Sequence, residues 1–256
     1  MNRNYRDHFY LWCHEPGVYN SIEGLGGRSS ATPVEAADFM GIENIIMVSY
    51  AGKPTPPFAP IQQQYTKFRH VVWSIIGDTA CKYDNPEAYV DEVISLKRKF
   101  PNVSGGIMDD FFNEDRSAFN LDAISAKMRA AELPLWVVVY DFQLDRQEVL
   151  QKLRQCDVIT FWIWDVKNLA SMEKNLAALH GLFPGKKIVA GCYLWNFGGE
   201  LPLTVRHMEY QCCAALDLLD AGIISGIIIL GSPLIGMKLP SIEWTRNWIR
   251  KISLQN

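Results

Sequence analysis

The stretch SGGIMDDFF (residues 104–112) sets two acids, Asp109 and Asp110, directly after small and apolar residues. Residues 103–109 lack the alternation of polar and apolar side chains, which indicates a strand covered on both faces. Two adjacent carboxylates do not belong in a hydrophobic core unless they are paired or functional. The fold therefore decides whether this strand ends at a place where acids are useful.

Similar apolar runs recur along the chain and alternate with helical segments. One predicted helix begins at the capping box Thr32-Pro33-Val34-Glu35 and ends at Gly41. The predicted strands are residues 8–15, 44–50, 70–78, 103–109, 134–141, 157–165, 186–196 and 226–232. Eight βα units in about 250 residues predict an α/β fold, a single (β/α)8 TIM barrel. A doubly wound open sheet is the main alternative, but it usually has fewer strands and often carries G-x-G-x-x-G, which is absent here.

The composition limits the classes of protein that this chain can belong to. Residues 1–256 show no linker or composition break, so we expect one TIM-barrel domain. A net charge of −3 offers no basic patch for nucleic acid, and no apolar run reaches the ~18 residues of a membrane span. The polar start MNRNYRDHFY lacks the apolar core of a signal peptide. We therefore expect a cytoplasmic protein, unless a signal peptide has been removed, with no nucleic-acid or membrane partner; its oligomeric state stays open.

None of the six cysteines falls in a C-x-x-C pattern or at zinc-ligand spacing from a histidine. Free buried thiols are the expectation, and they favour a reducing compartment. We predict no bound cofactor and no metal site from these residues.

Acidic residues gather at one end of the predicted strands. In a TIM barrel the chemistry lies at the carboxyl ends of the strands. A single Asp after a strand often caps a turn or a helix, which would explain Asp78 or Asp141 taken alone. The doublet of Asp109 and Asp110 is different: a single cap uses one carboxylate, which leaves the second without a structural explanation. The strand ends carry His14 and Glu15; Tyr50; Asp78; Asp109 and Asp110; Asp141; Asp165; Trp195 and Asn196; and Ser232.

Only one member of the doublet is expected to face the barrel interior, because successive residues of a strand point to opposite sides. Inward-facing small residues at Ser104 and Gly106 would place Asp110 in register with the interior. A bend at the strand end would reverse this, so both acids are candidates.

Aromatic residues gather near the same strand ends. Rings stack on the C–H faces of sugars while carboxylates accept hydrogen bonds from hydroxyls, which favours a neutral polyhydroxylated ligand. A phosphorylated substrate is less favoured, since no Arg or Lys converges after the last strand, and no strand carries an internal Lys for a Schiff base. The aromatic residues are Trp12, Trp73, Phe111, Phe112, Tyr140, Trp162, Trp164, Tyr193 and Trp195.

The stretches IMDDFF and TFWIWD resemble strand ends of (β/α)8 glycoside hydrolases, especially those of the α-galactosidase and α-glucosidase type. The resemblance implies that an Asp of the fourth strand is the nucleophile and an Asp after the sixth strand is the acid/base.

The leading hypothesis is a glycoside hydrolase acting on a small-molecule or oligosaccharide substrate. Asp110 or Asp109 would be nucleophile or base, and Asp165 the general acid, its pKa raised by neighbouring tryptophans. A metal-dependent sugar isomerase, aldolase or lyase using His14, Glu15 and the Asps is the first alternative. A saccharide-binding barrel without catalysis is the second. The predicted substrate-binding residues are His14, Glu15, Trp12, Tyr50, Asp78, Asp141, Trp164, Tyr193, Trp195 and Asn196.

Overall fold

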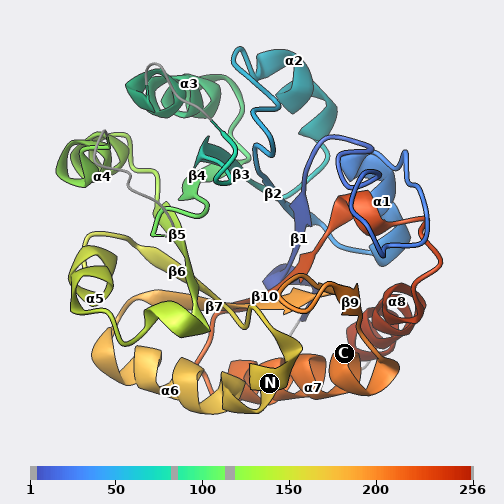
Figure 1. The fold of residues 1–256 in the computed structure, drawn as a ribbon. Coiled ribbons are helices and arrows are strands. Elements are labelled where there is room, and N and C mark those ends of the chain that lie inside the picture. The colour runs from blue at the N-terminus through green and yellow to red at the C-terminus, as the bar shows by residue number, and fades with distance from the viewer. Residues whose placement is uncertain (1–4, 82–85, 113–118, 255–256) are drawn as a thin grey trace.

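The structure, a computed structural model, describes residues 5–81, 86–112 and 119–254. Eight parallel strands close into a barrel in the order β1-β10-β7-β6-β5-β4-β3-β2, and helices surround it as an outer ring (Figure 1). This arrangement confirms the predicted TIM barrel. The barrel strands are β1 (Phe9–Cys13), β2 (Asn44–Met47), β3 (His70–Ile76), β4 (Val103–Met108), β5 (Leu135–Tyr140), β6 (Val158–Trp162), β7 (Lys187–Tyr193) and β10 (Gly226–Leu230).

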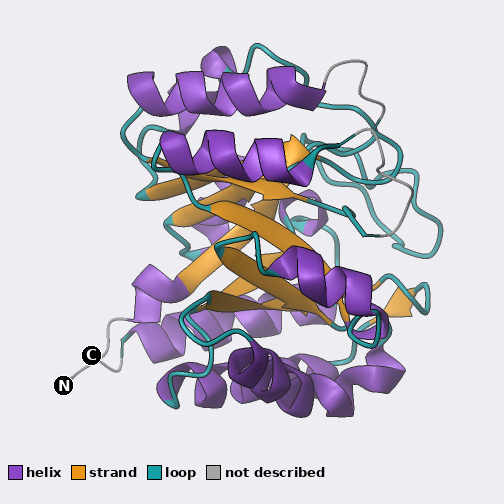
Figure 2. Ribbon diagram, turned by 90° about the vertical axis from the view of Figure 1, so that its left-hand side faces the viewer, coloured by secondary structure: helices purple, strands orange, loops and turns teal. Residues whose placement is uncertain are grey.

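The helices cover the outer face of the barrel, as the side view shows (Figure 2). The predicted capping box is present: the Thr32 hydroxyl accepts from the Glu35 amide, and a Glu35 carboxylate oxygen accepts from the Thr32 amide. The α-helices are α1 (Pro33–Met40), α2 (Ala59–Gln62), α3 (Pro86–Lys99), α4 (Leu121–Ala130), α5 (Gln147–Leu153), α6 (Met172–Leu182), α7 (Val205–Asp220) and α8 (Pro240–Ser253). The 3-10 helices are η1 (Tyr5–His8), η2 (Gln63–Tyr65), η3 (Asp141–Gln143), η4 (Val166–Ser171) and η5 (Ser232–Leu234).

The two glycines of β4 face opposite sides of the sheet. A Cβ on Gly105 would lie 2.6 Å from Nε1 of Trp136, whose ring meets that of Tyr10 edge to face at 5.5 Å. A Cβ on Gly106 would instead lie 2.8 Å from Cε of Met128 in the covering helix α4. Gly105 is therefore the inward residue, and the expected inward position of Gly106 was wrong. By alternation this register points Asp109, rather than Asp110, into the barrel.

A second aromatic pair fills the barrel nearer its carboxyl end. A Cβ on Gly191 of β7 would lie 2.1 Å from the ring of Trp162, so the missing side chain leaves the space that the indole occupies. Trp162 also meets Trp12 edge to face at 5.3 Å. These two indoles close the barrel beneath its carboxyl-terminal mouth.

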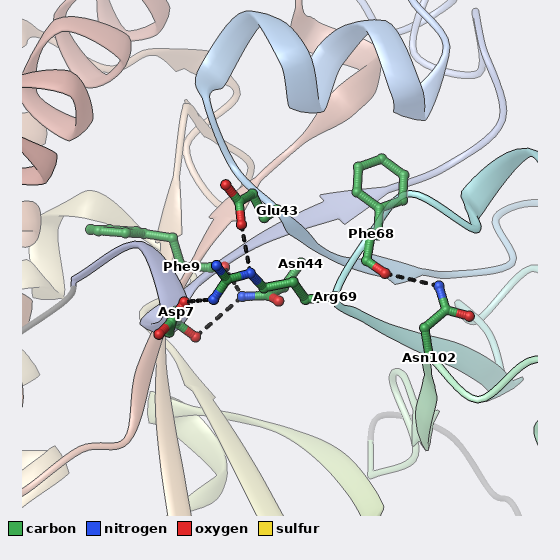
Figure 3. Close-up of polar contacts among 7 residues, drawn as sticks. All are labelled: Asp7, Phe9, Glu43, Asn44, Phe68, Arg69 and Asn102. Carbon is green, nitrogen blue, oxygen red and sulfur yellow. Dashed lines mark hydrogen bonds and ion pairs between the residues drawn. The ribbon is translucent and has the colours of Figure 1, made fainter.

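Polar contacts hold the amino-terminal end of strands β1 to β4 (Figure 3). The Asn44 side-chain amide donates to the carbonyl oxygens of Asp7 at 3.2 Å and Phe9 at 2.9 Å. Arg69 forms ion pairs with Asp7 and, at 2.7 Å, with Glu43. At the next strand the Asn102 amide donates to the Phe68 carbonyl at 3.0 Å. In a TIM barrel this end serves stability, so the reactive site is sought at the opposite end.

All eight barrel strands end one to three residues earlier than the sequence predicts, and after β6 and β7 the chain then takes a new course. β6 ends at Trp162 and β7 at Tyr193, so the residues that follow belong to loops. After β7 the chain forms a separate hairpin of β8 (Trp195–Asn196) and β9 (Leu201–Pro202). Both differences move predicted site residues away from the barrel strands.

Within the described part of the chain, no helix combines the length and the apolar character of a membrane span.

Candidate functional site

A cavity of about 230 Å³ opens at the carboxyl ends of the strands. Every barrel strand, or the loop directly after it, contributes to its wall. The lining residues are Trp12, His14, Tyr19, Tyr50, Asp78, Thr79, Asp109, Asp110, Val138, Tyr140, Trp162, Trp164, Tyr193, Phe197 and Leu230. The cavity is therefore bounded by aromatic rings and three carboxylates.

Both members of the acidic doublet line this cavity. The Asp109 amide donates to the Ile76 carbonyl at 2.8 Å, which extends the β3–β4 ladder by one residue. Asp110 then adopts a left-handed backbone conformation with φ +47, and its amide donates to Oδ1 of Asp109 at 3.0 Å. Asp and Asn are among the few non-glycine residues that visit this region readily. The bend at Asp110 brings both carboxylates to one cavity, although a regular strand would separate them.

Three buried tyrosines supply protonated hydroxyls around the doublet. The Tyr140 hydroxyl donates to Oδ1 of Asp110 at 2.7 Å. Burial raises the pKa values of Tyr19, Tyr140 and Tyr193 well above the ordinary range, and the charge of Asp109 raises all three further. These phenols therefore act as hydrogen-bond donors at neutral pH.

Asp78 is the third carboxylate of the cavity and lies after β3. Its Oδ1 accepts from the Ala51 amide at 3.0 Å and from the Cys81 thiol at 2.9 Å. These bonds tie the loops after β2 and β3 together and fix the carboxylate at the cavity wall.

His14 lies at the end of β1 with both ring nitrogens engaged. Nδ1 is 2.9 Å from the Val48 carbonyl and must donate to it, so Nε2 accepts the Trp12 indole N–H at 3.1 Å. Burial lowers the pKa of His14 to about 4, which makes the imidazole neutral at neutral pH. Its contribution to the cavity is a neutral ring.

An exposed aromatic residue stands at the mouth of the cavity. Trp164 is 38% exposed and stacks on Phe197 with ring centroids 6.2 Å apart. Its indole also meets Tyr140 edge to face at 5.4 Å. A large apolar ring this accessible, next to carboxylates, suits contact with a ligand better than a role in the core.

The structure does not bring Asp165 into this cavity. It follows the early end of β6 and caps η4, where its carboxylate accepts from the Lys167 amide at 3.2 Å and pairs with the Lys167 ammonium at 2.8 Å. These bonds lower its pKa, so the expected rise caused by tryptophan neighbours was wrong. Asp141 does not line the cavity either. Its carboxylate accepts hydrogen bonds from the Trp164 backbone amide at 3.0 Å and from the Asn168 side-chain amide at 2.9 Å.

Three further predicted residues lie outside the lining. Trp195 is 1% exposed and packs beneath the loop of Gly24, because the chain leaves the barrel after Tyr193 and enters the β8–β9 hairpin. Asn196 is buried in the same hairpin, and its side-chain oxygen accepts from the Val166 amide at 3.0 Å. Glu15 follows His14 but is not among the lining residues.

The remaining predicted residues do come together at the cavity: Asp109, Asp110, Asp78, His14, Trp12, Tyr50, Trp164 and Tyr193. Among the other aromatic residues predicted near the strand ends, Tyr140 and Trp162 line the cavity, whereas Trp73 stacks on Phe58 behind β3. Tyr19 and Phe197 were missed. Both lie in loops, and only their nearness to a predicted strand end could have indicated them.

The metal-ligand set that the alternative hypothesis requires is not assembled. Both nitrogens of His14 are hydrogen-bonded within the protein, and Glu15 is not among the residues that line the cavity with the three Asps. Among the described residues, no group of three or more His, Cys, Asp and Glu side chains has the geometry to hold a metal ion.

Comparisons with known proteins support the fold. No protein-family model and no curated protein matches the chain. Among solved structures, the catalytic domain of a hyperthermophilic chitinase from Pyrococcus furiosus is 12% identical with a TM-score of 0.60, covering 96% of this chain and 95% of that one. The GH18 chitinase ChiB of Flavobacterium johnsoniae is 10% identical with a TM-score of 0.57, covering 96% and 94%. A mutant tryptophan synthase alpha-subunit from Pyrococcus furiosus is 14% identical with a TM-score of 0.52, covering 100% of both chains.

These likenesses show that the chain shares its fold with enzymes, and the enzymes include glycoside hydrolases, as the sequence resemblance implied. The reaction has to be argued from the cavity itself.

Proposed function

We propose that this protein is a glycoside hydrolase whose reacting carboxylates are Asp109 and Asp110. The observation that carries the proposal is the convergence of both carboxylates on one aromatic-walled cavity at the mouth of the barrel. Glycoside hydrolysis needs two carboxyl groups beside one glycosidic bond. Trp164 at the entrance supplies an accessible ring for the sugar face.

The hydrogen bonds suggest a division of roles within the doublet. Tyr140 donates to Asp110 at 2.7 Å, and such a bond stabilises negative charge on the carboxylate. We therefore assign Asp110 as nucleophile or base. Asp109 is the other carboxyl group; it would take up a proton before the bond is cleaved and transfer it to the leaving oxygen, the role first expected of Asp165.

The charge of the cavity also disfavours a phosphorylated substrate. Three carboxylates line it, and no Lys or Arg does so among the residues that the structure describes. Phosphate recognition normally relies on such cations.

Activity and stability measurements on paired variants test this function. We expect Asp109→Asn and Asp110→Asn to lower turnover of aryl glycosides and oligosaccharides about 10²–10⁴-fold, the range of acid–base catalysis, with small changes in melting temperature. Asp165→Asn is the matched control: it alters a strand-end Asp that caps a helix outside the cavity, so turnover should persist. Full turnover in Asp110→Asn, or its loss only in Asp165→Asn, would contradict the assignment.

Three further measurements separate the proposal from its alternatives. Turnover that survives a chelator favours the hydrolase, whereas a stoichiometric metal found by elemental analysis, together with loss on chelation, favours the metal-dependent enzyme. Tight saccharide binding without turnover of any substrate would favour the second alternative, a saccharide-binding barrel without catalysis.

A further inference from the structure

An exposed aromatic ring lies just outside the cavity, in the loop after β5. Phe142 is 52% exposed and is not among the residues that line the cavity. Its ring is parallel to that of Tyr140 within 6°, with the ring centroids 5.4 Å apart. Tyr140 does line the cavity, and its hydroxyl donates to Asp110. The aromatic wall beside the doublet therefore continues outward, through Tyr140, to a ring that faces solvent.

Hydrogen bonds fix the position of this ring relative to Trp164. Phe142 is the middle residue of η3, and the Gln143 side-chain oxygen accepts from the Tyr140 amide at 3.0 Å to close that turn. Asp141, also in η3, accepts from the Trp164 amide at 3.0 Å and so ties the loop after β5 to the loop after β6. Trp164 meets the same Tyr140 ring edge to face at 5.4 Å. Phe142 and Trp164, which we call the aromatic rim, are therefore two exposed rings supported by one buried tyrosine.

The size of the cavity requires part of the substrate to lie outside it. Pockets that enclose a whole small-molecule ligand usually measure about 300–1,000 Å³, whereas this cavity measures about 230 Å³. Trp12 and Trp162 close it from below, so a longer substrate cannot pass deeper into the barrel. A glycosidic bond held at Asp109 and Asp110 joins two sugar units, and the cavity has room for one of them. The other unit must lie at the mouth, where the aromatic rim is.

A single exposed aromatic residue is common on protein surfaces and needs no function. Phe142 differs because its ring packs on the tyrosine that bonds a proposed reacting carboxylate, and because a second exposed ring, that of Trp164, contacts the same tyrosine. Sugar rings present C–H faces that pack on aromatic surfaces of this kind.

We infer that the aromatic rim binds the sugar unit on the outer side of the scissile bond, which makes Phe142 a specificity-determining residue for linked sugars. This inference rests on the proposed function and adds where the second unit of its substrate is held.

Binding of matched monosaccharide and disaccharide ligands tests the inference. The probes are the methyl α- and β-glycosides of glucose and N-acetylglucosamine, the β-1,4-thio-linked disaccharides of both sugars, and the α-1,4-thio-linked disaccharide of glucose. A sulfur linkage resists hydrolysis, so affinity can be measured with the active protein. By calorimetry we expect the disaccharide of at least one series to bind ten-fold or more tighter than its methyl glycoside. That gain reports the contact of the second unit.

Variants assign the gain to the rim. Phe142→Ala should bind the disaccharide roughly three- to ten-fold more weakly, the range of one aromatic stacking contact, and should bind the methyl glycoside as the wild type does. Phe142→Trp keeps an aromatic ring and should keep the gain. Tyr210→Ala is the control, because Tyr210 is 38% exposed on α7 and does not line the cavity. Since Phe142 is more than half exposed, its truncation should leave the melting temperature nearly unchanged.

The outcomes distinguish this inference from the proposed function. A gain that survives unchanged in Phe142→Ala, or equal binding of both ligands by the wild-type protein, would overturn the role of the rim, and turnover of glycosides would still leave the hydrolase standing. Equal weakening of both ligands in Phe142→Ala would also overturn it, since the ring would then shape the cavity itself. A gain that depends on Phe142, without turnover of any glycoside, would sustain the rim and contradict the hydrolase. Failure of every saccharide to bind would overturn both.

Discussion

The Tyr140 hydroxyl lies 2.7 Å from Oδ1 of Asp110 and joins the end of β5 to the doublet that follows β4. The bond crosses between neighbouring barrel strands at the point where their residues reach the cavity. Because the phenol is buried and its pKa is well above the ordinary value, it remains a donor throughout the neutral range. The charge distribution at Asp110 therefore depends on a residue of another strand.

Tyr140→Phe should lower kcat about ten-fold or more while the protein stays folded. A hydrogen bond to a charged group contributes about 1.5–3 kcal/mol, and this one is made to the proposed reacting carboxylate. Tyr210→Phe is the matched control, since Tyr210 donates to Glu173 at 3.0 Å on the exposed helical surface. Steady-state kinetics with an aryl glycoside provide the measurement. Wild-type kcat in Tyr140→Phe would show that the bond is only structural.

Gly191→Ala should destabilise the protein because no space remains for a methyl group. The added Cβ would lie 2.1 Å from the Trp162 ring, and overpacking of this kind costs about 1–3 kcal/mol or more. Gly181→Ala serves as control: it lies in α6, and its methyl group would meet no described atom within 4 Å beyond the backbone of its own helix. There the exchange should be neutral or stabilise by about 0.5–1 kcal/mol. Urea denaturation would measure both, and equal stability of the two variants would refute the packing argument.

The sequence was sufficient to predict the barrel because the same pattern, a buried strand followed by a helix, is repeated along the chain. Each buried strand is a continuous apolar run and each is followed by a helical segment, so an error at one boundary does not change the fold. The same logic placed the Asp109–Asp110 doublet at the end of the barrel where the cavity opens. It could not settle which acid faces inward, because that depends on the contacts of Gly105 and Gly106 with Trp136 and Met128.

Asp165 and Trp195 miss the cavity because of the course that the chain takes after β6 and β7: Asp165 caps η4, and Trp195 enters the β8–β9 hairpin. Asp165 and Trp195 were placed at strand ends, but β6 and β7 finish three and two residues earlier, at Trp162 and Tyr193. An apolar run continues into the loop in both cases, so composition does not mark the boundary. Tyr19 reaches the cavity from a loop, where no periodic pattern predicts the direction of a side chain.

The pH dependence of stability should contain a contribution from His14. Burial lowers its pKa in the folded protein to about 4 from the ordinary 6.5, so the unfolded chain binds the proton first as the pH falls. The stabilisation is fully present above pH 6.5 and is lost progressively between about 6.5 and 4, by roughly 3 kcal/mol in total. Unfolding of the wild-type protein and His14→Gln, measured from pH 7 to 4, would test this. An identical slope in both proteins would exclude His14 as the source.

Two tryptophans that the sequence placed together as sugar platforms should now behave differently. Trp195 is 1% exposed, so Trp195→Ala should cost ~3–5 kcal/mol of stability through the cavity it leaves. Trp164 is 38% exposed and lines the mouth, so Trp164→Ala should leave the fold nearly intact. Its saccharide affinity should fall by up to a few kcal/mol, as loss of a stacking surface predicts. Thermal melting and calorimetric titration of both variants would measure the two effects separately. If Trp164→Ala instead unfolds the protein, or binds saccharide as the wild type does, the ring at the mouth is not a platform and the carbohydrate assignment of this cavity loses its main apolar contact.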